Sequence, residues 1–125
     1  MRVGNAFSNS DIRSLVINSR GHIFAGTNGM YRSTDDGATW FEINAGLTNP
    51  IVFALAFNSN GDIYAGTDGG GMFRMMENAE HWTQINTGLM NTAILSLVLD
   101  SKDFIVAGTS GGGVFRSIRS TTSLN

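Results

Sequence analysis

The 125-residue sequence contains no cysteine and only one proline. Without cysteine the chain has neither disulfides nor thiolate metal sites, and this absence fits the cytosol and the cell exterior equally well. Charged residues make up 14% of the sequence, below the roughly 25% of an average soluble domain. Because the formal net charge is -2 and no basic stripe is present, we expect no nucleic-acid partner.

Long apolar runs are also absent from the sequence. No run reaches the roughly 18 apolar residues that indicate a membrane-spanning helix. The N-terminal residues Met-Arg-Val-Gly-Asn lack the apolar stretch of a signal peptide. We therefore expect a soluble chain with no membrane partner, in a compartment that composition does not specify.

Glycine, by contrast, is abundant, with 16 residues that recur at fixed positions. The tripeptide Ala-Gly-Thr occurs at 25–27, 65–67 and 107–109, with spacings of 40 and 42 residues. An apolar run ending in Asn-Ser or Asp-Ser precedes each copy, and an aromatic residue followed by arginine comes after it. One unit is therefore repeated three times.

Each unit reads as four short β-strands separated by turn residues. In the second unit the strands are expected at 51–57, 62–66, 72–76 and 82–86. Asn60-Gly61 and the glycine run 69–71 favour tight turns, so the strands should pair as antiparallel hairpins. The first strand is apolar almost throughout, which predicts neighbours on both of its faces. Four strands in a period of about 40 residues predict an all-β fold of propeller blades.

The predicted domain is a single propeller segment of three blades. We place blade 1 at about 12–49, blade 2 at about 51–91 and blade 3 at about 93–119. The third unit lacks an outer strand, and residues 1–5 align with 41–45, so an N-terminal strand should complete it. Since a ring typically has about four to eight blades, we predict a head-to-tail homodimer with six. A fragment of a longer protein and a nine-bladed trimer are the alternatives.

The segment 33–40 fits the pattern Ser-x-Asp-x-Gly-x-Thr-Trp, and it resembles the Asp-box, or BNR repeat. The whole unit is similar to blades of Asp-box propellers such as photosystem II assembly factors, sortilin-type receptors, sialidases and bacterial sensor propellers. The second and third units depart from the box, since Met75 and Glu77 replace its serine and aspartate in the second. The resemblance implies an extracytoplasmic tendency and a structural role for five residues, Ser33, Asp35, Gly37, Thr39 and Trp40.

Catalytic and metal-binding patterns are not found. His22 and His81 lie at different places in the repeat, and neither belongs to a motif with metal or nucleophile spacing. Calcium at Asp35 and Asp36 is the alternative to a purely structural turn, but two adjacent carboxylates fall short of the roughly six to eight oxygens that calcium takes. We expect no enzyme activity, no metal and no cofactor.

One arginine recurs at the same position in every unit, as Arg32, Arg74 and Arg116. Repetition in every blade favours a structural pairing over one converging site. The alternative is a ring of positive charge that receives an acidic partner.

A binding surface is expected where the loops between blades and the loops between second and third strands emerge on one face. That face should carry six short polar side chains, Asn9, Asn49, Asn91, Asn28, Asp68 and Ser110. Such side chains suit hydrogen bonds to sugars or peptides, although they also cap turns. We predict a non-catalytic module that binds a ligand or a protein. The alternatives are a carbohydrate-binding, lectin-like propeller and a degenerate sialidase-like glycoside hydrolase.

Overall fold

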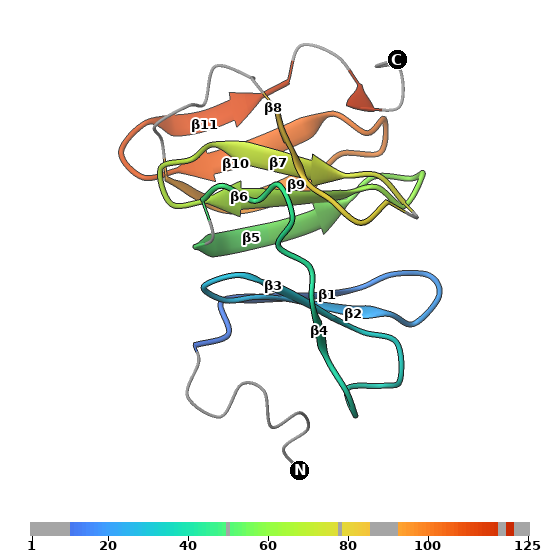
Figure 1. Ribbon diagram of the computed structural model, residues 1–125. Coiled ribbons are helices and arrows are strands. Elements are labelled where there is room, and N and C mark those ends of the chain that lie inside the picture. The colour runs from blue at the N-terminus through green and yellow to red at the C-terminus, as the bar shows by residue number, and fades with distance from the viewer. Residues whose placement is uncertain (1–10, 50, 78, 86–92, 118–119, 122–125) are drawn as a thin grey trace.

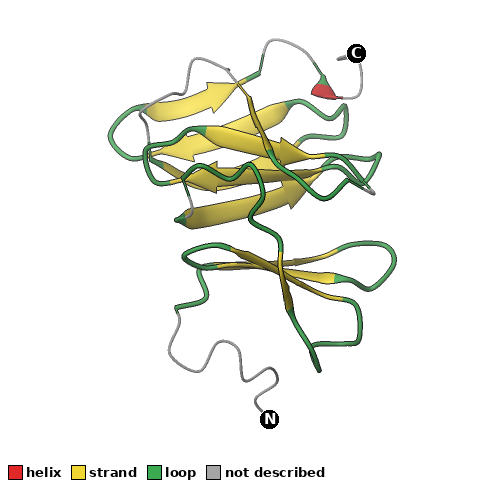
Figure 2. Ribbon diagram, in the orientation of Figure 1, coloured by secondary structure: helices red, strands yellow, loops and turns green. Residues whose placement is uncertain are grey.

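A computed structural model describes residues 11–49, 51–77, 79–85, 93–117 and 120–121. Strands and turns make up nearly all of this part of the chain (Figure 2). The first sheet contains β1 (Ser14–Ile17), β2 (Ile23–Gly26), β3 (Met30–Ser33) and β4 (Phe41–Glu42). The second contains β5 (Val52–Phe57), β6 (Ile63–Thr67), β7 (Met72–Met75) and β8 (Thr83–Ile85). The third contains β9 (Ile94–Leu99), β10 (Ile105–Thr109) and β11 (Gly113–Arg116). We call these sheets blades 1, 2 and 3.

Every sheet follows the order of the chain. Blades 1 and 2 are antiparallel meanders of four strands, and the described part of blade 3 has three. The prediction of an all-β fold built from antiparallel hairpins is confirmed. Within the described ranges, no helix is long and apolar enough to cross a membrane.

The turn between the first two strands of each blade depends on one repeated side chain. The Oδ1 atom of Asn18 accepts hydrogen bonds from the backbone amides two and four residues later. Asn58 and Asp100 do the same in blades 2 and 3. A short side chain that holds two turn amides stabilises this hairpin, which explains why the repeat carries Asn or Asp there.

The blades stack with their first strands next to one another. Strand β5 lies between β1 and β9, so blade 2 is the middle layer (Figure 1). One core cluster fills the space between blades 1 and 2, and it includes Phe24, Met30, Leu55 and Phe73. A second cluster between blades 2 and 3 includes Tyr64.

The repeated Ala-Gly-Thr segment lies where neighbouring blades approach each other. A Cβ atom on Gly26 would lie 2.8 Å from Cγ1 of Val52 in the next blade, and one on Gly66 would lie 2.5 Å from Cγ2 of Ile94. The preceding alanine is fully buried in all three blades. At Gly26 and Gly66, a side chain from the next blade therefore occupies the space that a Cβ atom would need, and at Gly26 the Ser14 hydroxyl of the same blade, at 2.6 Å, occupies it as well.

The expectation that each first strand is covered on both faces is correct only for β5. Leu15 and Ile17 of β1 are exposed, and so are Leu95 and Val98 of β9. The physical reason is position, because only blade 2 has a blade on each side. An apolar first strand therefore indicates that both faces of a blade can pack against neighbours. The position of the blade in the stack determines which of these faces is buried.

Candidate functional site

The turn between β3 and β4 is held together by its own side chains. Ser33 Oγ accepts a hydrogen bond from the Gly37 amide at 2.8 Å, and Asp35 Oδ1 accepts one from the Thr39 amide at 2.8 Å. The Trp40 indole donates to the Gly37 carbonyl at 3.0 Å. Gly37 has a φ of 91°, which favours glycine. All five residues of the Asp-box-like motif thus contribute to one turn.

The carboxylate of Asp35 is the centre of this turn. The hydroxyl and then the backbone amide of Thr39 donate to it, as does the Ser33 hydroxyl. These hydrogen bonds hold the pKa of Asp35 below its ordinary value, because they favour the ionised form. The side chain is exposed, and its interactions with described residues all lie within the turn.

The predicted loop face has four of its six residues in the described ranges. Asn49 Nδ2 donates to the Asp68 carbonyl at 2.8 Å, so these two residues meet at the junction of blades 1 and 2. Asn28 accepts a hydrogen bond from Arg13, and the Ser110 amide bonds to the Ala93 carbonyl. Two further residues, Asn9 and Asn91, lie outside the described residues. The side chains of Asn49 and Asn28 therefore form hydrogen bonds with other residues of this chain.

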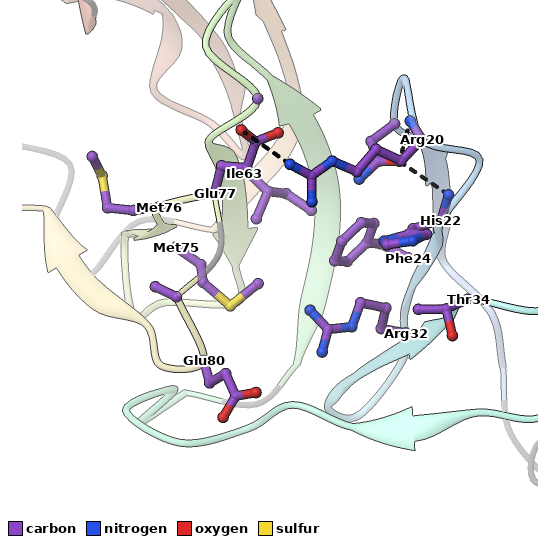
Figure 3. Close-up of a pocket in the computed structure, with 13 residues that line it drawn as sticks. Arg20, His22, Phe24, Arg32, Thr34, Ile63, Met75, Met76, Glu77 and Glu80 are labelled. Carbon is purple, nitrogen blue, oxygen red and sulfur yellow. Dashed lines mark hydrogen bonds and ion pairs between the residues drawn. The ribbon is translucent and has the colours of Figure 1, made fainter.

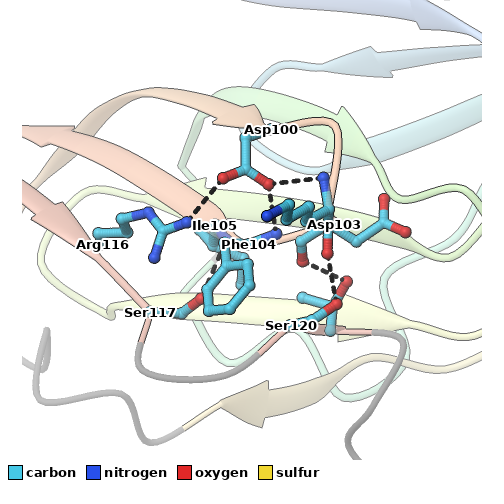
Figure 4. A network of polar contacts seen from close by, with 9 residues as sticks. Asp100, Asp103, Phe104, Ile105, Arg116, Ser117 and Ser120 are labelled. Carbon is cyan, nitrogen blue, oxygen red and sulfur yellow. Dashed lines mark hydrogen bonds and ion pairs between the residues drawn. The ribbon is translucent and has the colours of Figure 1, made fainter.

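The three repeated arginines have different surroundings. Arg116 forms an ion pair with Asp100 at 2.8 Å and lies over the Phe104 ring, 4.0 Å from its centroid (Figure 4). The backbone amide of Phe104, followed by the Arg116 guanidinium and the Lys102 amide, holds the pKa of Asp100 below its ordinary value. In blade 3 the arginine is thus tied to the first hairpin of its own sheet.

Blades 1 and 2 have no carboxylate at the position that Asp100 occupies in blade 3. The position of Asp100 is occupied by Asn18 in blade 1 and by Asn58 in blade 2, and a neutral amide cannot form an ion pair. Arg74 lies opposite Tyr64 and Thr83 in the sheet register. The side chain of Arg32 instead points into a cavity (Figure 3).

This cavity lies between blades 1 and 2 and has a volume of about 280 Å³. It is at the end of the blades that carries the first-to-second and third-to-fourth strand turns, opposite the loop face predicted from sequence. Its lining consists of Asn18, Arg20, His22, Phe24, Arg32, Thr34, Gly61, Ile63, Met75, Met76, Glu77, Ala79 and Glu80.

The two walls of the cavity carry opposite charges. Blade 1 contributes Arg20 and Arg32, whereas blade 2 contributes Glu77 and Glu80 (Figure 3). Arg20 reaches across to Glu77, with 4.0 Å between Nη2 and Oε1. Arrays of this kind recognise charged or polar ligands by ion pairs and hydrogen bonds.

The corresponding junction between blades 2 and 3 is occupied by side chains of the protein. The Asp103 carboxylate accepts hydrogen bonds from the amide and the hydroxyl of Ser59. Asn58 Nδ2 donates to Thr121 Oγ1 at 3.2 Å, and Tyr64 is fully buried beside it. Among the described residues, the second junction therefore holds its own side chains at the place where the first junction has the cavity beside Arg32.

Of the charged residues of the cavity, the repeat in the sequence indicates only Arg32, and His22 belongs to no metal or nucleophile motif. A usable signal was present, because the asparagine at positions 18 and 58 becomes aspartate at 100. That change indicates which arginine is paired within its own blade. In the described part of the chain, no three His, Cys, Asp or Glu side chains are grouped so that they could hold a metal ion.

Comparisons with known proteins support the fold. No protein-family model matches the chain, and no curated protein sequence matches it significantly. Among solved structures, the extracellular domain of the putative hybrid two component system BT4673 from B. thetaiotaomicron matches with a TM-score of 0.77 and 25% identity, covering 97% of this chain and 17% of that one. YCF48 bound to D1 peptide matches with a TM-score of 0.69 and 17% identity, covering 85% of this chain and 36% of that one. Virginiamycin B lyase from Staphylococcus aureus matches with a TM-score of 0.60 and 17% identity, covering 94% of this chain and 44% of that one.

The sensor domain and YCF48 are β-propeller proteins, so the prediction of propeller blades is confirmed. The chain spans about a sixth of the sensor domain and about a third of the YCF48 chain. The similarity therefore concerns the blades and their stacking. The number of blades in the complete ring and the pairing of copies stay predictions.

Proposed function

We propose that this chain is a non-catalytic binding module of the Asp-box propeller type, and that it works as a head-to-tail homodimer with six blades. The hydrogen-bonded turn at 33–40 supports the Asp-box assignment. Two similar proteins support a binding role and an extracytoplasmic location. One is the extracellular domain of a putative signalling system, and the other was solved with a bound peptide.

The observation that carries the proposal is the contrast between repeat-equivalent residues. Leu55 and Leu97 face the preceding blade and are 7% and 8% exposed, whereas Leu15, at the same position in blade 1, is 60% exposed. Met30 and Met72 face the following blade and are fully buried, whereas Val114 is 75% exposed. Blade 1 thus exposes the face that the preceding blade covers in blades 2 and 3. Blade 3 exposes the face that the following blade covers in blades 1 and 2.

The two open faces match each other in kind. Within the chain, the first face of blade 2 packs on the second face of blade 1, and blade 3 packs on blade 2 in the same way. A second copy presents blade 1 to the open face of blade 3 and receives the reverse contact, so two copies close a ring with twofold symmetry. Burying these apolar side chains supplies the favourable term for the pair, about 25 cal/mol for each Å² removed from water before the entropy cost of association is subtracted.

The open edge of blade 3 gives the pair a second means of attachment. All four residues of β11 are exposed, and the described part of that sheet has no outer strand. An unpaired edge exposes backbone donors and acceptors that accept another strand. We propose that residues 1–5 of the partner supply this strand. These residues lie outside the described part of the chain.

Light scattering tests the assembly. The wild-type protein is expected at twice the 13.4-kDa chain mass. Val114→Glu is expected to give a folded monomer, because it places a charge in the contact without touching the core of its own chain. Phe41→Glu is the matched control, since Phe41 is also exposed but lies on the outer strand of blade 1, and it should stay dimeric. A folded wild-type monomer at every concentration contradicts the dimer, and a threefold mass contradicts the six-bladed ring.

Two assays test the binding role. A peptide array and a glycan array should give hits without turnover of any substrate. Repeated weak glycan hits that one monosaccharide displaces would replace the proposal by the lectin-like alternative. Hydrolysis of a fluorogenic sialoside would contradict the non-catalytic assignment.

A further inference from the structure

We propose that the cavity between blades 1 and 2 is a binding site for a free amino acid with an apolar side chain. Arg32 binds its carboxylate and Glu80 its ammonium group. The inference deepens the binding function proposed above and rests on it. It does not require the ring, because every lining residue belongs to one chain.

The first step is the state of Arg32. Its Nε atom is buried and has no hydrogen-bond partner among the described residues. The guanidinium also forms no ion pair with a described residue, and it points into the cavity (Figure 3). Because the Nε atom is buried, a ligand in the cavity would meet the terminal Nη atoms of the guanidinium, which carry further N–H donors. The planar fork of donors on arginine matches a carboxylate in two-point geometry.

The second step is the acidic wall. The partner of Glu77 is Arg20. Glu80 is exposed at the rim and forms no ion pair with a described residue. Arg32 and Glu80 also line a neighbouring hollow of about 290 Å³, so both charges border the same region of the junction. A ligand with one negative and one positive group therefore matches the two charges.

The third step is the apolar lining between these charges. Phe24, Ile63 and Met75 are buried members of the core cluster, and their surfaces form part of the cavity (Figure 3). The volume of about 280 Å³ is at the lower end of the roughly 300–1,000 Å³ of ligand pockets. The size favours a ligand of few atoms, and the lining favours an aliphatic or thioether side chain.

The acidic wall also decides against a strongly acidic ligand. A peptide with several carboxylates would bring like charges close to Glu77 and Glu80, and like charges at short range repel. The three repeated arginines do not act as one cationic ring either, because Arg116 is already paired with Asp100. A single zwitterion satisfies Arg32 without opposing the carboxylates.

Calorimetry with matched compounds tests the assignment on the wild-type protein. L-leucine and L-methionine are expected to bind. For leucine, 4-methylpentanoate lacks the ammonium group and 3-methylbutylamine lacks the carboxylate. Each should bind about tenfold more weakly or worse, because each loses one charged hydrogen-bonding group. Equal binding of 4-methylpentanoate and leucine overturns the role of Glu80. No heat with any amino acid at about 10 mM, well above a millimolar Kd, overturns the site.

Variants test the two charged residues. Arg32→Gln and Glu80→Gln should each weaken leucine binding about tenfold, with circular dichroism confirming the fold. Arg74→Gln changes the same repeat position outside the cavity lining and should leave the affinity unchanged. Equal loss in Arg74→Gln overturns the assignment. Light scattering on the same samples reports the assembly separately, so a dimer without leucine binding refutes this site alone.

Discussion

At the scale of single residues, the turn at 33–40 shows how one carboxylate organises a loop. Asp35 takes hydrogen bonds from Ser33 and Thr39, and these bonds keep its pKa below the ordinary value of 3.8. A carboxyl group with a lowered folded-state pKa stabilises the fold above its unfolded-state pKa. The contribution is lost as the pH falls through the folded-state value.

The acid stability of the protein should therefore depend on Asp35. In Asp35→Asn, the fall in Tm between about pH 5 and pH 2 is expected to be smaller than in the wild type, because the variant has no carboxylate to protonate. Thermal unfolding followed by circular dichroism across this range measures the effect. Asp36→Asn is the control, since Asp36 is adjacent, exposed and at a positive φ that asparagine tolerates. Identical pH profiles for the two variants would refute the role of Asp35.

The two tryptophans differ in what their indole groups hold. Trp82 is buried and donates to the Ile43 carbonyl at 2.8 Å, which joins blade 2 to blade 1. Trp82→Phe should lower the free energy of unfolding by about 1–3 kcal/mol, since a buried carbonyl loses its partner. Trp40→Phe changes a half-buried turn contact and should cost less. Urea titrations measure the free energy of unfolding of both variants. A larger decrease for Trp40→Phe than for Trp82→Phe would contradict this prediction.

At the scale of elements, the second strand of each blade sets how closely the next blade can approach. Gly66→Ala should destabilise the chain by about 1–3 kcal/mol, as overpacking does, because the new Cβ atom would lie 2.5 Å from Cγ2 of Ile94. Urea unfolding of Gly66→Ala, Ile94→Ala and the double variant forms the test. The double variant should cost less than the sum of the single losses. Simple additivity would show that the Cγ2 atom of Ile94 is not what limits the space at position 66.

The strands and hairpins were largely predictable from the sequence. Ala-Gly-Thr, the apolar first strand and Asn60-Gly61 are local patterns, and each depends on contacts within one blade or between repeated blades. The cavity was less accessible to prediction. It depends on which side chains meet across a junction, and residues from 18 to 80 contribute to it. The exchange of asparagine for aspartate at position 100 was the one local signal.

At the scale of the whole molecule, the open faces predict that stability depends on protein concentration. In the proposed dimer, a higher concentration raises Tm through mass action, and Val114→Glu should abolish this dependence. Thermal scans over a hundredfold dilution series provide the measurement. A wild-type Tm that is constant over the series would contradict the pairing of these faces.

Gly108 gives a second measure of the same contact. Among the described residues of the chain, a Cβ atom there would approach only the Ser96 side chain, whose hydroxyl oxygen would lie 2.5 Å away. In the proposed dimer, the repeat would place Ile12 of the partner subunit where Val52 and Ile94 lie in the other blades. Gly108→Ala should therefore weaken the dimer more than it destabilises the monomeric Val114→Glu background. Equal losses in both backgrounds would mean that no blade packs there.

The stacking of the blades is directional, because the surface facing backward at blade 1 differs from the surface facing forward at blade 3. In the proposed assembly, such a unit joins others only head to tail, and each added copy leaves one open face at either end until the ring closes. In that assembly, a substitution that changes the angle between blades would replace the closed pair with an open helical filament. The packing angle at these glycine-containing contacts between blades would then decide whether the proposed assembly is finite or open-ended.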